Sequence, residues 1–265
     1  MRLAAPTAAA LLFALCAPAL AQEAPVPIDL ANMPPPVQMM PGRDYQAVLD
    51  SPIRTDEDRA RDEARMTLQT LGFTGVQPGW KVADMIMGGG YFTRLFSAAV
   101  GPEGHVTAWQ PAEFVAFEPS YGEAADAADA LPNVETIRSP IGAPEFPSGL
   151  DLVFTAQNYH DLHLRPFPAD TAAKVNAAVF AALKPGGRYI IIDHHAVDGS
   201  DLSVAHDLHR IDHDTVVAEV ESAGFVLAGE AAALWNDDDP RTANVFDDSI
   251  RGRTSQFMIE FRKPE

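Results

Sequence analysis

The stretch Val82-Ala83-Asp84-Met85-Ile86-Met87-Gly88-Gly89-Gly90-Tyr91-Phe92-Thr93 decides the fold. Its first part is apolar except for one acid, which predicts a short buried strand, and the glycines then let the backbone turn sharply. Apolar residues recur at helical spacing from Phe92 onward, so a helix follows at once. Because a helix start presents unpaired N–H groups and positive potential, this corner is typical of nucleotide-binding sites. An ordinary strand-to-helix turn is the alternative, because short glycine patterns also recur by chance.

The rest of the chain alternates between apolar runs of strand length and helical patterns. Strands are predicted at residues 81–85, 105–109, 134–137, 150–156, 188–193, 225–234 and 255–262. Helices are predicted at residues 55–71, 91–100, 124–131, 170–183 and 214–223. Strands that alternate with helices form mostly parallel sheets covered on both faces, so the sequence predicts an α/β, Rossmann-like fold. The last two strands have no helix between them, which favours an antiparallel pair at one edge of the sheet.

The length and net charge of the chain limit which kinds of molecule it can bind. The 265 residues can hold one α/β domain with an extension, and the formal net charge is −18. Such a charge disfavours nucleic acid, whose phosphates would be repelled, and also anionic membrane surfaces. The acidic balance is otherwise typical of solubility. A small-molecule substrate is the partner that we expect, and the sequence does not indicate an oligomeric state.

The N-terminus has the pattern of a secretory signal peptide. Arg2 gives a positive start, an apolar run follows, and Ala19-Leu20-Ala21 forms a small-x-small cleavage site. The run is too short for a permanent membrane helix, so no stable insertion is expected. Cleavage near Ala21 would remove Cys16, the only cysteine. We therefore expect a signal peptide at 1–21, a proline-rich linker or arm at 22–43 and a domain at 44–265, in a periplasmic or secreted protein.

The order of these segments resembles a class I S-adenosylmethionine-dependent methyltransferase, and in particular an exported branch of predicted methyltransferases. The glycine corner and the Leu183–Gly187 turn carry the resemblance together with several shorter segments. These segments are residues 58–62, 157–161, 209–212, 223–225 and 251–254. The resemblance covers about residues 55–264. It implies S-adenosylmethionine as the cofactor and a helix over 55–71 that covers the cleft as a lid.

The resemblance also implies which residues hold the cofactor. The methionine end of the cofactor would lie against Asp84 and the corner, and the remaining contacts would come from the ends of two further strands. The implied cofactor-binding residues are Asp84, Gly88, Gly89, Gly90, Gln110 and Asn158. Two residues depart from the family pattern. Ile86 stands where the family commonly has the first glycine, and Gln110 follows the second strand, where an acid usually holds the ribose hydroxyls.

All histidines except His105 lie between residues 160 and 213. His160 and Asp161 follow one predicted strand and His194 follows the next, so at least two of these groups should converge over the cleft. Three hypotheses remain open: a general base, with His160 and Asp161 as the catalytic candidates; a divalent metal site, which rests on clustering alone; and ordinary polar loop residues. No metal ligands are therefore assigned.

The remaining site residues are expected to contact the substrate. The substrate-binding candidates are Tyr159, His194, His209 and Arg210. Histidines 206, 209 and 213 have the spacing of one helix face, and Arg210 could pair with an acidic substrate or with Asp212. The expected function is methyl transfer to a small-molecule acceptor in the cell envelope. The alternative is a methyltransferase-like periplasmic protein that has lost catalysis and binds another nucleoside or a divalent metal.

Overall fold

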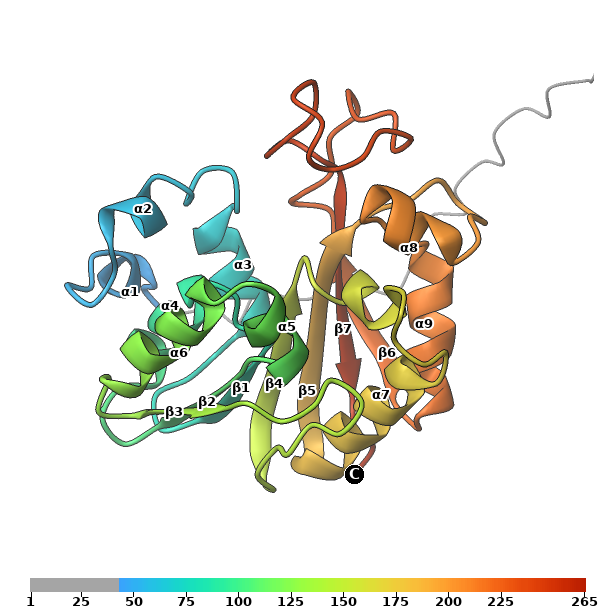
Figure 1. The fold of residues 1–265 in the computed structure, drawn as a ribbon. Coiled ribbons are helices and arrows are strands. Elements are labelled where there is room, and N and C mark those ends of the chain that lie inside the picture. The colour runs from blue at the N-terminus through green and yellow to red at the C-terminus, as the bar shows by residue number, and fades with distance from the viewer. Residues whose placement is uncertain (1–42) are drawn as a thin grey trace, which may run out of the picture. The chain divides into compact units, whose positions relative to one another are not determined.

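The computed structural model describes residues 43–265. The predicted signal peptide and the predicted arm up to residue 42 lie outside the described residues. Within the described part, one seven-stranded sheet has the order β3-β2-β1-β4-β5-β7-β6 (Figure 1). Its strands are β1 (Lys81–Met85), β2 (His105–Trp109), β3 (Val134–Ile137), β4 (Leu150–Ala156), β5 (Leu183–His194), β6 (Val226–Ala231) and β7 (Gln256–Arg262).

The pairing of the strands confirms the predicted topology. β1 to β5 pair in parallel, whereas β7 is antiparallel to both β5 and β6. The first four strands have the predicted bounds. The strand order reverses between β1 and β4, so the carboxyl ends of these two strands are where a ligand cleft is expected.

Helices cover both faces of the sheet. They are α1 (Gln46–Leu49), α2 (Asp56–Arg59), α3 (Thr67–Thr74), α4 (Tyr91–Val100), α5 (Ala112–Phe117), α6 (Ser120–Asp129), α7 (Thr171–Ala182), α8 (Ser203–Leu208) and α9 (His213–Ser222), with a 3-10 turn η1 (His160–His163). Side chains alternate across each strand, so Val82 packs with α4 on one face and Ala83 packs with α7 on the other. Each face therefore has its own apolar core.

The predicted helix over 55–71 is wrong in its continuity. α2 ends at Arg59, turns follow, and α3 begins only after Met66, whose φ of 43° is left-handed. A capping box between Thr55 and Asp58 starts α2 as the acids of the first turn predicted. Across the break, Asp58 pairs with Arg94 and Asp62 pairs with Arg54.

The shared helix face predicted for histidines 206, 209 and 213 is also wrong. α8 ends at Leu208, His209 has a left-handed φ of 54°, and α9 begins at His213. Asp212 caps α9 by accepting a hydrogen bond from the Thr215 amide at 3.2 Å, so the chain changes direction between the two helices. Among residues 43–265, no helix is both long enough and apolar enough to cross a bilayer.

Candidate functional site

The corner between β1 and α4 turns through three left-handed backbone positions. Ile86, Gly88 and Gly90 have φ values of 59°, 54° and 77°. Glycine adopts this conformation freely, whereas it costs a residue with a Cβ about 1–2 kcal/mol. The Gly88 amide donates to Gln110 Oε1 at 2.8 Å, which ties the corner to the end of β2. The fold thus holds Ile86 in the conformation of a glycine, and strain of this kind is common at functional loops.

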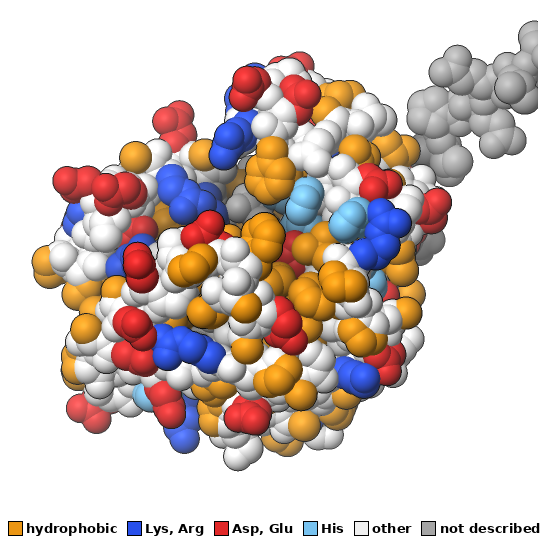
Figure 2. Space-filling view, viewed as in Figure 1, with side chains coloured by type: hydrophobic (Ala, Val, Ile, Leu, Met, Phe, Trp, Pro, Cys, Tyr) orange, Lys and Arg blue, Asp and Glu red, His pale blue; other side chains and the backbone are white. Residues whose placement is uncertain are grey.

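A cavity of about 670 Å³ lies beside this corner, at the carboxyl ends of β1, β4 and β5. Its volume is within the range of small-molecule sites. The wall comes from the corner, the loop after β4, the end of β5, the turns after α2 and the loop near Phe246. Figure 2 shows histidine side chains gathered among hydrophobic ones in a hollow on this face. The cavity therefore lies at the reversal in strand order, where open α/β sheets bind ligands.

Most of the residues predicted from sequence line this cavity, and some do not. Those on its wall are Asp84, Gly88, Gly89, Asn158, His160, Asp161, His194 and His209. Those that lie off the wall are Gly90, Gln110, Tyr159 and Arg210. Gln110 is fully buried behind the corner, and its Nε2 has no hydrogen-bond partner among the described residues. Gly90 is covered by the Arg94 side chain, since a Cβ there would meet Arg94 Nη1 at 2.8 Å.

Asp84 and Asn158 fix the two sides of the cavity floor. Asp84 is the next-to-last residue of β1 and accepts a hydrogen bond from Thr93 Oγ1 at 2.6 Å. Burial raises the pKa of Asp84 to about 6, against the opposing effect of this hydrogen bond. Asn158 Nδ2 donates to the carbonyls of Ile86 at 2.9 Å and Ala156 at 2.8 Å. Asn158 therefore joins the corner to the end of β4.

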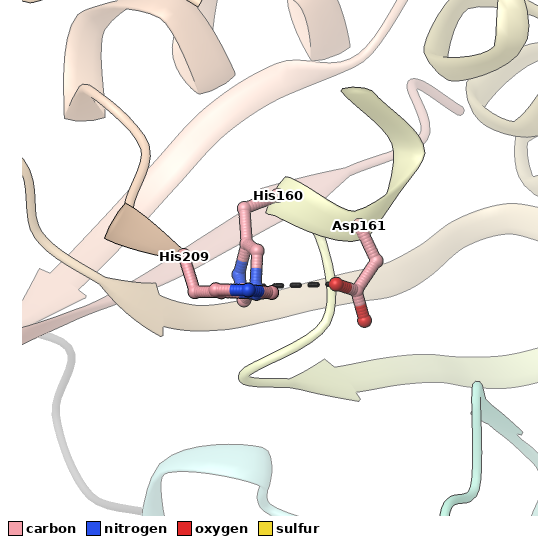
Figure 3. A group of neighbouring side chains, drawn as sticks. All are labelled: His160, Asp161 and His209. Carbon is pink, nitrogen blue, oxygen red and sulfur yellow. Dashed lines mark hydrogen bonds and ion pairs between the residues drawn. The ribbon is translucent and has the colours of Figure 1, made fainter. Parts of the chain in front are cut away.

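His160 is held from three sides. The Asp193 carboxylate accepts from its Nδ1 at 2.8 Å and from its backbone amide at 2.7 Å. Its Nε2 lies 3.2 Å from Asp161 Oδ1 and 3.3 Å from His209 Nδ1 (Figure 3). Burial disfavours the charged ring, yet Asp193 and Asp161 raise the pKa of His160 to about 10. This raised pKa favours the protonated ring at neutral pH, and the catalytic role expected of His160 and Asp161 stays a prediction.

The other two histidines on the wall are neutral bases. Burial lowers the pKa of His194 to about 3, and its Nδ1 lies 2.7 Å from Thr254 Oγ1. Burial and the charge on His160 also lower the pKa of His209. The cavity therefore combines one imidazolium, two neutral imidazoles and the Asp161 carboxylate within a small volume.

Two arginines that the sequence analysis did not assign face the same cavity. Arg61 and Arg65 come from the turns after α2, and both guanidinium groups lie over the Tyr91 ring, at 5.5 and 4.7 Å from its centroid. Burial lowers the pKa of Arg65 to about 10, which still leaves it charged at neutral pH. The sequence offered only a weak signal for this, the repeated arginines of residues 59–65 within the segment expected to cover the cleft.

The segment that carries these arginines is fastened to α4. Arg94 binds Asp58 through Nε and Nη2, each at 2.6 Å, and Tyr91 Oη donates to Asp62 at 2.5 Å. Arg94 Nη2 also donates to the Gly89 carbonyl at 3.1 Å. The segment expected to form a helical lid is therefore a tied loop with short helices, and Arg61 and Arg65 of this loop line the cavity.

Arg210 and Tyr159 are buried in the protein interior and do not line the cavity. Arg210 is fully buried and binds Asp239 through two nitrogens, at 2.8 and 3.0 Å. Asp212, one of the two partners that the sequence suggested for Arg210, caps α9 instead. Tyr159 is fully buried, donates to Glu219 at 2.9 Å and accepts from Asn176 at 2.8 Å. Their positions give no support to the predicted contacts with a substrate.

The chain matches no protein-family model and no curated protein sequence. Its structure is similar to that of a SAM-dependent methyltransferase from Aquifex aeolicus, at 19% identity and a TM-score of 0.52, with 83% of this chain and 99% of that chain covered. It is also similar to a putative sarcosine dimethylglycine methyltransferase from Galdieria sulphuraria, at 16% identity and a TM-score of 0.54, with 78% and 88% covered.

A third similar structure is the complex between the Haloferax volcanii Trm112 methyltransferase activator and the putative methyltransferase, at 16% identity and a TM-score of 0.55. The match covers 84% of this chain and 100% of that chain. At these identities the likeness concerns the fold. Together with the sheet order and the antiparallel β7, it shows that the chain has the class I S-adenosylmethionine-dependent methyltransferase fold.

Proposed function

We propose that this protein is an S-adenosylmethionine-dependent methyltransferase that acts on a small-molecule acceptor in the cell envelope. The observation that carries the proposal is the cavity beside the glycine corner, in a fold shared with methyltransferases. Its volume of about 670 Å³ is at the scale of a cofactor with a small acceptor. The location rests on the signal-peptide pattern of residues 1–21.

The residues present fit the cofactor. A Cβ placed on Gly88 or Gly89 would meet no atom within 4 Å, so a ligand can approach the backbone closely there. Asp84 offers a buried carboxylate to a cationic amino group, and Gln110 offers a buried Nε2 with no partner among the described residues. Gln110 is covered in this conformation, so its contact with a ligand requires a small movement of the corner.

The cofactor supplies an electrophilic methyl group, and the chain supplies position and proton transfer. We assign acceptor binding to the wall formed by Arg61, Arg65 and Phe246, which combines charge with an aromatic surface. His160 donates a hydrogen bond from Nε2 to the bound substrate. The Asp161 carboxylate takes up the proton that the hydroxyl or amine of this substrate releases when it is methylated. His194 and His209 complete this side of the cavity as neutral groups.

Calorimetric titration with S-adenosylhomocysteine tests the proposal. Micromolar affinity with one site per chain is the expected result. Absence of binding at millimolar ligand would overturn the assignment, because the cavity would then not hold an adenosyl sulfur compound. N-terminal sequencing of the protein recovered from the periplasm tests the location, since the mature chain should begin at Gln22.

Affinity for the same ligand is expected to fall about tenfold between pH 7 and pH 5, because a carboxyl of pKa about 6 is then mostly protonated. The sign follows from the charge: above pH 6 Asp84 is a carboxylate that attracts the ligand's ammonium, and below pH 6 it is neutral. Titrations of the parent chain and of Asp84→Asn across this range make the measurement. The variant should show a flatter profile, and a parent profile that is itself flat would contradict the role of Asp84.

Ile86 supports a second candidate, a binding protein that has lost catalysis. It lies on the cavity wall where the family commonly has glycine, and it is held at a φ of 59°. Such a protein would bind a nucleoside without turnover. Incubation with methyl-labelled S-adenosylmethionine and an extract of envelope small molecules separates the two candidates, since only the enzyme transfers the label.

A further inference from the structure

We propose that His160, Asp161 and His209 form a binding site for a divalent first-row transition-metal ion on the cavity wall. Each residue offers one ligand atom, and these atoms lie within 4.8 Å of one another. Within residues 43–265 this is the one group of three histidine, cysteine or acidic side chains with that property. All three line the cavity, so a bound ion would be open to a ligand from the cavity.

The distances suit one shared ion. His160 Nε2 lies 3.2 Å from Asp161 Oδ1 and 3.3 Å from His209 Nδ1. Two atoms bound tetrahedrally at about 2.0–2.1 Å from a metal lie about 3.3 Å apart. Figure 3 shows both imidazole rings and the carboxylate directed toward one point. Little movement of the side chains is therefore needed for all three to contact one ion.

Asp193 provides the support that metal-binding histidines usually have. Its carboxylate accepts from His160 Nδ1 at 2.8 Å, which fixes the ring and leaves Nε2 directed at the site, where a bound ion would replace the Nε2 proton. Asp193 is fully buried and is itself held by the amides of His160 and His194, each at 2.7 Å. The carboxylate–histidine arrangement is thus built into the ends of β4 and β5.

His209 is the C-cap residue of α8 and lies against the same cavity. His209 has a left-handed φ of 54°, which costs a residue other than glycine free energy. Its ring is held edge-on between His160, at 5.4 Å, and Phe246, at 4.9 Å between centroids. In this position His209 Nδ1 lies 3.3 Å from His160 Nε2.

The ligand chemistry selects the class of ion. Two imidazoles and one carboxylate suit zinc, iron or manganese, and a three-residue site leaves coordination positions open. One consequence rests on the proposed function: an ion held here would favour acceptors with an oxygen or nitrogen donor able to complete its coordination. The site itself requires no cofactor, so it can be tested alone.

The test uses tag-free, chelator-treated mature protein, titrated calorimetrically with Zn²⁺ and followed by visible absorption with Co²⁺. One equivalent should bind, and His209→Ala and Asp161→Asn should each weaken binding at least about tenfold. His105→Ala is the matched control, because His105 lies at the start of β2 beside Glu135 and away from the cavity. This control should bind as the parent does.

Absence of binding at millimolar metal would overturn the site, and so would binding that His209→Ala and Asp161→Asn leave unchanged. A parallel titration with S-adenosylhomocysteine in the presence of chelator distinguishes the two proposals. Adenosyl binding without metal binding would remove the metal site alone. Metal binding without adenosyl binding would remove the proposed function alone.

Discussion

A Gly89→Leu variant is expected to fold like the parent chain and to bind S-adenosylhomocysteine about 100-fold more weakly, a loss of about 2.7 kcal/mol. Gly89 lines the cavity, lies outside the left-handed region, and would give a Cβ that meets no atom within 4 Å. The protein therefore has room for the new side chain, whereas a ligand packed on the corner does not. Calorimetric titration measures the loss, and thermal unfolding checks the fold.

Gly142→Leu is the matched control for this experiment. Gly142 lies in the loop after β3 and is absent from the cavity wall, and a Cβ placed on it would likewise meet no atom within 4 Å. Both variants add the same apolar side chain, so a general effect of leucine would appear in both. Parent-like affinity in Gly89→Leu would show that the ligand does not lie against the corner.

The central sheet was predictable because its signals are local. β1 and β4 are apolar runs between turn residues, and the glycines after β1 end that strand at the predicted residue. The same reasoning predicted that Asp84, Asn158 and His160 lie together at the carboxyl ends of the strands, because the ends of neighbouring parallel strands meet. All three residues line the same cavity.

The rest of the site depends on partners that are remote in sequence. Arg210 pairs with Asp239, which lies in the long polar loop between β6 and β7, where no periodicity marks a contact. His209 reaches His160 only through a left-handed turn that the sequence favours no more than a continuing helix. The raised pKa of His160 likewise follows from Asp193, which lies in β5, 33 residues away in the sequence, and pairs there with Phe257 of β7.

Asp193→Ala is expected to lower the free energy of unfolding at pH 7 by about 3–5 kcal/mol, because it leaves the charged ring of His160 buried without its main partner. The variant also leaves the amides of His160 and His194 without their acceptor. Denaturant unfolding gives the difference. Asp198→Ala is the control: Asp198 is exposed and pairs with Arg241, so its loss should cost less than about 1 kcal/mol.

The pH dependence of this difference in the free energy of unfolding shows whether the variant has lost an ion pair or only packing around the missing side chain. The pKa of His160 is raised from 6.5 to about 10, so its stabilising effect is complete below pH 6.5 and is lost as the pH rises through 10. The difference in free energy of unfolding between the parent and Asp193→Ala should therefore shrink between pH 6 and pH 10. A gap that stays constant over this range would mean that His160 is neutral in the folded protein, and Asp193 would then act only as a hydrogen-bond acceptor.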